Sequence, residues 1–176
     1  MEDHQFMTHA LALGRRNQGQ CWPNPAVGCV IVKEGRVVGR GWTAIGGRPH
    51  AEPQALQRAG ALAAGATAFI TLEPCTHHGQ TGPCCDALIA AKVARVVIGA
   101  PDPDPRVAGR GVAALKAAGI EVVEGVEAEA ADWDHAGFLN RILRGRPHIA
   151  LKMAASFDGK SAMKNGESQW ITGPLA

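Results

Sequence analysis

Three short motifs supply the residue types that bind a transition metal. His50 begins a His-x-Glu motif, and Cys75 and Cys84 each follow a proline. One imidazole and two thiolates leave the fourth position of a tetrahedral zinc ion open, as in a catalytic rather than a structural site. Two thiolates neutralise the dication, while water at the open position still has a lowered pKa and gives hydroxide near neutral pH. We therefore expect these three residues to bind one zinc ion per chain.

Glu52 is placed to move a proton rather than to bind the metal. It follows His50 by two residues, where a helix is predicted to begin. Cys84 also lies at a predicted helix start, where backbone N–H groups and the helix dipole favour a thiolate. A His-x-Glu motif followed by Pro-Cys is found in zinc-dependent nucleobase deaminases, where the histidine and cysteines bind the metal and the glutamate transfers protons. The combination predicts Glu52 as the catalytic acid and base.

Each motif also has a simpler interpretation. His-x-Glu occurs often by chance, and cysteines beside prolines are frequently just small buried residues. The conjunction of both motifs at strand-to-helix junctions favours the metal site. Cys85 is an alternative third ligand, but Pro83 before Cys84 repeats the Pro-Cys arrangement of the second ligand, so we choose Cys84. Cys85 then faces the core, and Cys21 and Cys29 are structural.

The composition is that of an ordinary globular protein. The 176 residues are 46% hydrophobic and 19% charged, with a net charge of +2, which excludes a disordered chain. The basic residues form no run, which argues against a partner such as duplex nucleic acid. No window of about 18 apolar residues occurs, and the first five residues are unlike a signal peptide, so we expect a cytoplasmic protein without a membrane partner.

The hydrophobic pattern predicts a strand hairpin followed by alternating helices and strands. The expected helices are 3–18, 51–64, 84–92 and 111–118, and the expected strands are 27–32, 36–42, 68–72, 95–99 and 120–123. Glu34-Gly35 is the two-residue turn of the hairpin. The alternation implies crossover connections, and therefore a mixed five-stranded sheet with helices on both faces. The predicted fold is a three-layer α/β/α arrangement.

The character of the sequence changes near residue 146. Residues 144–147 form a short basic stretch with Gly and Pro, and an apolar segment that resembles an opening strand follows. Only about thirty residues remain, too few for a second core. We predict a domain at 1–146, and a linker with the truncated start of a second domain at 147–176.

The longer stretches around these motifs resemble the bifunctional riboflavin-biosynthesis deaminase/reductase family, within the cytidine deaminase-like superfamily. The resemblance covers essentially the entire chain and is strongest at 23–28, 73–79, 83–88 and 102–111. Eight residues separate the two cysteine ligands, where cytidine and tRNA-adenosine deaminases typically have two. The resemblance implies zinc-dependent hydrolytic deamination of 2,5-diamino-6-(5-phosphoribosylamino)pyrimidin-4(3H)-one at C2, giving 5-amino-6-(5-phosphoribosylamino)uracil and ammonia.

The resemblance also implies a substrate site. The residue matching Asn24 holds the ring or the ribose, and those matching His77 and Asp102 line the ribose-phosphate side. Simpler interpretations are a turn residue at Asn24, a solvated loop residue at His77, and turn formers at Asp102 and Asp104. The expected substrate-binding set is Asn24, Ala51, His77, Gln80, Asp102 and Asp104.

Gln80 departs from the family pattern. Many relatives carry Lys or Arg at this position, a cation suited to a phosphate. Glutamine can hydrogen-bond a phosphate but supplies no charge. If another cation meets the phosphate, Arg106 and Arg48 are the candidates.

The tail resembles the beginning of the family's C-terminal reductase domain. In the complete family protein, the residues matching Ala154 and Trp170 contact NADPH, and the one matching Ser168 contacts substrate. About thirty residues cannot enclose a dinucleotide and a substrate, so we expect NADPH binding only where the reductase domain is complete.

Two other functions fit part of the pattern. One is a nucleobase or tRNA deaminase of the same fold, against which the long loop 76–83 and the lack of a basic or aromatic run argue. The other is a non-catalytic zinc module used for interaction, against which the open fourth position and Glu52 argue. The expected partner is therefore a small phosphoribosyl-pyrimidine, with no nucleic acid and no membrane. A homo-oligomer is left open.

Overall fold

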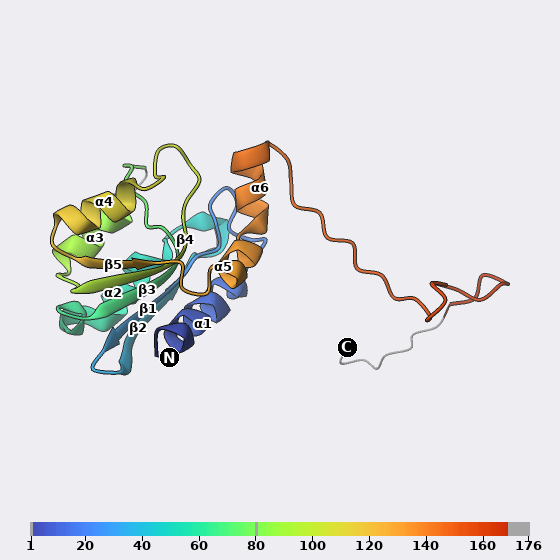
Figure 1. Cartoon of the computed structure of the whole chain (residues 1–176), viewed down its shortest axis with the longest axis horizontal. Helices are drawn as coiled ribbons and strands as arrows, with labels where there is room; N and C mark the ends of the chain where they lie inside the picture. Colours follow the sequence, from blue (N-terminus) through green and yellow to red (C-terminus); the bar gives the residue numbers. More distant parts are fainter. Residues whose placement is uncertain (1, 80, 169–176) are drawn as a thin grey trace.

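A five-stranded sheet forms the centre of the protein, with the strand order β2-β1-β3-β4-β5 (Figure 1). The computed structural model describes residues 2–79 and 81–168. The strands are β1 (Gly28–Lys33), β2 (Arg36–Trp42), β3 (Thr67–Leu72), β4 (Arg95–Ala100) and β5 (Glu121–Glu124). Strand β1 is antiparallel to both β2 and β3, whereas β3, β4 and β5 are parallel to one another. The predicted mixed sheet is confirmed.

Helices cover both faces of this sheet. The α-helices of the described residues are α1 (Glu2–Gly14), α2 (Ala51–Ala59), α3 (Cys84–Ala90), α4 (Arg110–Ala117), α5 (Ala128–Asp134) and α6 (Ala136–Arg144). Helix α2 packs on β1 and β2 and contacts α3, which in turn contacts α4. Helix α1 packs on β1 and β3 and contacts α5. The two groups lie on opposite sides of the sheet in Figure 1, which confirms the predicted three-layer arrangement.

One glycine allows α2 to lie directly on the sheet. A Cβ atom at Gly41 on β2 would come within 1.9 Å of the carbonyl oxygen of Ala51, the first residue of α2. Any side chain at this position would therefore push the start of the helix away from β2. The same helix start carries His50 and Glu52, so this close contact fixes the place of both side chains.

Two predicted helices are shorter in the structure. Helix α1 ends at Gly14 and continues as a 3₁₀ turn over Arg15–Asn17, and α2 ends at Ala59 and continues as a 3₁₀ turn over Gly60–Ala63. Gly60 has a φ angle of 54°. Helices commonly stop where a glycine takes a positive φ angle. The other predicted boundaries agree to within two residues.

The prediction omits α5 and α6. Helix α5 has only seven residues, and α6 contains no fully buried residue. Helix α5 is too short for an apolar stripe to stand out in the sequence, whereas α6 carries apolar residues at helical spacing (Phe138, Leu139, Ile142 and Leu143) that the prediction did not use. The omission matters because α6 forms one wall of the candidate site described below.

The chain runs away from the sheet and its helices after α6. Gly145 follows this helix with a φ angle of 65°, in the left-handed region. Residues 147–168 are exposed and contain neither helix nor strand, and Figure 1 shows them leading away from the sheet. Within residues 2–79 and 81–168, no helix has the length and apolar character needed to cross a membrane.

Candidate active site

Three elements bring the predicted metal ligands together. His50 directly precedes α2, Cys75 lies in the loop after β3, and Cys84 is the first residue of α3. Their ligand atoms all lie within 4.8 Å of one another. The His50 Nδ1 atom is 3.4 Å from the Cys84 sulfur and 3.8 Å from the Cys75 sulfur. The structure therefore groups residues that are up to 34 positions apart in the sequence.

The electrostatics of the two thiols fit a bound cation. A hydrogen bond from the Cys84 side chain lowers the pKa of Cys75 to about 4, and His50 acts in the same direction. The same contact raises the pKa of Cys84 far above its usual range. A dication bound between the two sulfurs would stabilise both of them as thiolates. Two sulfurs and one imidazole nitrogen are the donors that zinc prefers.

Cys85 lies outside this group of ligands. Its thiol donates to the carbonyl oxygen of Pro74 at 3.3 Å, and the side chain belongs to the hydrophobic core. Helical geometry explains the difference, because adjacent residues on a helix point in directions about 100° apart. Cys84 thus faces His50, and Cys85 faces the interior.

Glu52 lies beside the metal-binding group in the first turn of α2. Its side chain is 3% exposed and lines the same cleft as His50 and Cys75. Burial raises the pKa of the Glu52 carboxyl. A carboxyl with a raised pKa holds its proton more tightly than an ordinary one and is therefore better suited to take up a proton and return it. The position and the environment of Glu52 suit proton transfer.

A cleft of about 100 Å³ contains these groups. Four residues expected to bind substrate line it: Asn24, His77, Asp102 and Asp104. Ala51 does not join them, because its side chain is fully buried in the hydrophobic core. Gln80 lies outside the described residues.

Asn24 links the segment before β1 to the metal ligands. Its amide nitrogen donates to the carbonyl oxygen of Gly47 at 2.7 Å and lies 3.4 Å from the Nε2 atom of His50. The Nδ1 atom of His50 faces the two sulfurs and its Nε2 atom faces Asn24. The imidazole ring is therefore held between Asn24 and the cysteines. Asn24 is thus both a structural residue of this loop and part of the cleft wall.

The loop after β4 contributes two carboxylates with different environments. Burial raises the pKa of Asp102 to about 6, whereas hydrogen bonds from Arg106 lower the pKa of Asp104 to about 2. The backbone N–H of Asp104 donates to the Asp102 carboxylate at 2.9 Å, as in a turn. Both aspartates therefore shape the loop as well as lining the cleft.

Helix α6 contributes residues that the sequence analysis missed. Phe138, Arg141 and Ile142 all line the cleft. They are spaced at i, i+3 and i+4, the spacing of one face of a helix. That spacing was the available signal in the sequence.

Two of the three expected reductase-side residues can be placed, and both lie outside this cleft. Ala154 and Ser168 are in the exposed tail, and neither lines the cleft. Trp170 lies outside the described residues.

The fold and the site are those of a cytidine deaminase-like protein, and comparison with known sequences agrees with this class. The sequence model of the cytidine and deoxycytidylate deaminase zinc-binding region matches residues 1–100. The chain belongs to this deaminase family.

Within this family, the chain is similar to riboflavin biosynthesis proteins named RibD. It is 55% identical to RibD of Escherichia coli over 176 residues, which are all of this chain and 48% of the relative. The solved structure of Acinetobacter baumannii RibD superposes with a TM-score of 0.84 at 49% identity, covering 98% of this chain and 48% of that one.

A third relative has a more descriptive name. The diaminohydroxyphosphoribosylaminopyrimidine deaminase/5-amino-6-(5-phosphoribosylamino)uracil reductase of Thermotoga maritima superposes with a TM-score of 0.89 at 43% identity, covering 99% of this chain and 50% of that one. The chain therefore spans about half the length of the relatives it matches.

Proposed function

We propose that this chain deaminates 2,5-diamino-6-(5-phosphoribosylamino)pyrimidin-4(3H)-one by hydrolysis, giving 5-amino-6-(5-phosphoribosylamino)uracil and ammonia. The observation that carries the proposal is the buried Glu52 carboxyl in one cleft with His50 and Cys75, whose ligand atoms lie within 4.8 Å of each other and of the Cys84 sulfur. The names and the high identity of the RibD relatives support the substrate.

The chemistry divides between the cofactor and the protein. His50, Cys75 and Cys84 would hold a zinc ion, which would supply the Lewis acidity that makes water nucleophilic near neutral pH. Glu52 accepts the proton of the attacking water and delivers protons to the ring nitrogen and to the departing amine. Its raised pKa suits both steps, because the same carboxyl must be basic first and acidic afterwards.

The walls of the cleft hold the ring and limit access of bulk water. Asn24 is held by the Gly47 carbonyl and keeps one amide oxygen for the substrate. Leu72 and Phe138 supply apolar surface beside the polar groups. Such a mixture of apolar walls and a few fixed polar groups is typical of small-molecule sites.

We propose that the deaminase domain comprises residues 1–146 and that residues 147–176 are a linker with the start of a reductase domain. The end of α6 at Arg144 and the exposed segment after it support this boundary. The relatives are about twice as long as this chain. A role for Ala154, Ser168 and Trp170 toward NADPH or the reductase substrate requires the remainder of that domain.

Ammonia release tests the proposed reaction. The zinc-loaded chain is incubated with the phosphoribosylated diaminopyrimidine, and ammonia and the uracil product are measured. A tRNA anticodon stem-loop and cytidine are assayed separately as alternative substrates. Turnover of the diaminopyrimidine alone is expected, whereas turnover of only the stem-loop or cytidine would overturn the proposal.

A further inference from the structure

The cleft is too small for the whole of the proposed substrate. Its volume is about 100 Å³, whereas small-molecule sites usually measure roughly 300–1,000 Å³. The pyrimidine ring must reach Glu52, so the ribose and phosphate must extend beyond the cleft. A wider hollow of about 670 Å³ adjoins it, and the two share the walls formed by Pro23–Pro25, Phe138 and Arg141. This hollow offers room for the rest of the substrate.

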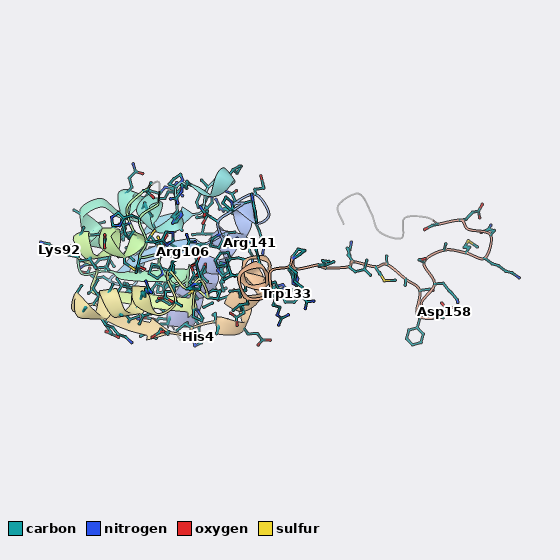
Figure 2. The ribbon with its side chains drawn as sticks, turned by 90° about the horizontal axis from the view of Figure 1, so that it is seen from above. His4, Lys92, Arg106, Trp133, Arg141 and Asp158 are labelled. Carbon is teal, nitrogen blue, oxygen red and sulfur yellow. The ribbon has the colours of Figure 1, made fainter. Side chains whose placement is uncertain are left out.

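An anion entering this region meets several carboxylates. Glu52, Glu73, Asp102 and Asp104 line the cleft. Two arginines also line it, Arg106 and Arg141, and Figure 2 labels both side chains. Arg106 is paired with Asp104 at 2.6 Å, so its charge is already balanced. Within residues 2–79 and 81–168, no carboxylate forms an ion pair with Arg141.

The guanidinium group of Arg141 is held in place while most of its donors remain available. It donates to the carbonyl oxygen of Pro23 at 3.0 Å. It also lies 4.9 Å from the ring centre of Trp22 and 5.4 Å from that of Phe138. A guanidinium carries five N–H donors, and the bond to Pro23 uses one of them. A planar, fixed group with unused donors matches the geometry of a phosphate.

We infer that Arg141 binds the phosphate of the substrate at the junction of the cleft and the hollow. The inference rests on the proposed function and extends it to the anionic end of the substrate. It places the phosphate-binding cation on α6, whereas the sequence suggested Arg106 or Arg48. Arg48 does not line the cleft, and its guanidinium donates to the hydroxyl of Thr81 at 2.9 Å.

The inference predicts an effect that depends on the phosphate. In Arg141→Gln, KM for the phosphorylated substrate is expected to rise about ten-fold, the loss of one charge-assisted hydrogen bond. The kcat value should change little, because the phosphate contact is the same in the ground and transition states. KM for the dephosphorylated analogue should stay constant. Arg141→Lys should restore part of the affinity, and Arg144→Gln, an exposed change on the same helix that does not line the cleft, should match the wild type.

Two kinetic results would overturn the inference. An equal rise in KM for both substrates in Arg141→Gln would mean that Arg141 only positions the Pro23 segment. A phosphate-specific effect in Arg106→Gln but not in Arg141→Gln would place the phosphate at Arg106 instead.

Binding of ribose 5-phosphate, measured by calorimetry, separates this inference from the proposed reaction. The wild type should bind this probe about ten-fold more tightly than Arg141→Gln. That difference would support the anion site even in a chain that releases no ammonia from the diaminopyrimidine. Equal binding by the two proteins would refute it, whatever the catalytic result.

Discussion

The carboxylate of Glu73 accepts the backbone N–H of Gly111 at 2.9 Å, and so joins the end of β3 to the start of α4. Its other oxygen accepts the backbone N–H of Gly109 at 3.1 Å. A Cβ atom at Gly111 would lie 2.5 Å from the carbonyl oxygen of Pro74, so the two segments touch. Glu73 therefore ties the loop that carries Asp102 to the loop that carries Cys75.

Glu73→Gln should loosen this connection. An amide has one acceptor oxygen, so its NH₂ group would face backbone N–H donors on one side. Leaving buried donors unpaired costs roughly 1–3 kcal/mol, and urea unfolding should show a loss of that order. If the amide NH₂ group faces Gly109, the hydrogen bond to Gly109 is lost and the loop that carries Asp102 should move. KM should then rise more than kcat falls. Unchanged stability would contradict the structural role given to Glu73.

Metal content should distinguish a predicted ligand, Cys75, from the core cysteine Cys85. Cys75→Ser should lose nearly all zinc, because it removes a thiolate from a site with three protein ligands. Cys85→Ser should keep its zinc, since its side chain donates to the Pro74 carbonyl in the core. Elemental analysis of the purified variants measures both. Full zinc retention in Cys75→Ser would remove the basis of the proposed site.

Glu52→Gln should separate metal binding from turnover. The change preserves size and hydrogen bonding, and Glu52 is outside the ligand group, so zinc content should equal that of the wild type. Because an amide cannot accept the proton of water, kcat should fall by at least ~10². Steady-state ammonia release and metal analysis on the same preparation test this. A variant with a near-normal rate would show that another group moves the proton.

His135 should make the protein less stable in mild acid. Its Nε2 atom lies 3.1 Å from the Thr71 hydroxyl, and burial lowers its pKa from 6.5 to about 4. Between these values the unfolded chain binds a proton that the folded protein does not. The free energy of unfolding should therefore fall as the pH drops from 6.5 to about 4, by up to about 3 kcal/mol.

Urea unfolding of the wild type and His135→Gln at several pH values tests this. Zinc release in acid affects both proteins, so the relevant quantity is the difference between their pH dependences. The variant should lose less stability in acid than the wild type. Parallel curves would mean that His135 makes no contribution to the acid sensitivity.

The chain should not oxidise NADPH. The 30 or so residues that resemble the reductase domain are too few to enclose a dinucleotide and a substrate. NADPH absorbance should stay at the background rate when the deaminated product is added. Measurable oxidation by the purified chain would show that the boundary proposed at residue 146 is wrong.

The sequence by itself determined the features that depend on a few neighbouring residues. Glu52 follows His50 by two positions at a helix start, and the turn at Glu34-Gly35 takes positive φ angles of 50° and 71°. Alternating strands and helices also imply the mixed sheet. Such patterns are readable because side-chain periodicity and turn geometry repeat over short distances.

Only the tertiary structure decided how distant segments complete the site. Arg141 meets the carbonyl oxygen of Pro23 across 118 positions, and Glu73 meets the backbone of Gly109 and Gly111 across 36 and 38. The partners of Glu73 are backbone groups, which every residue except proline carries, so residue types could not identify them. Their pairing depends on loop paths and on the packing of α6, which are fixed only when the whole chain folds.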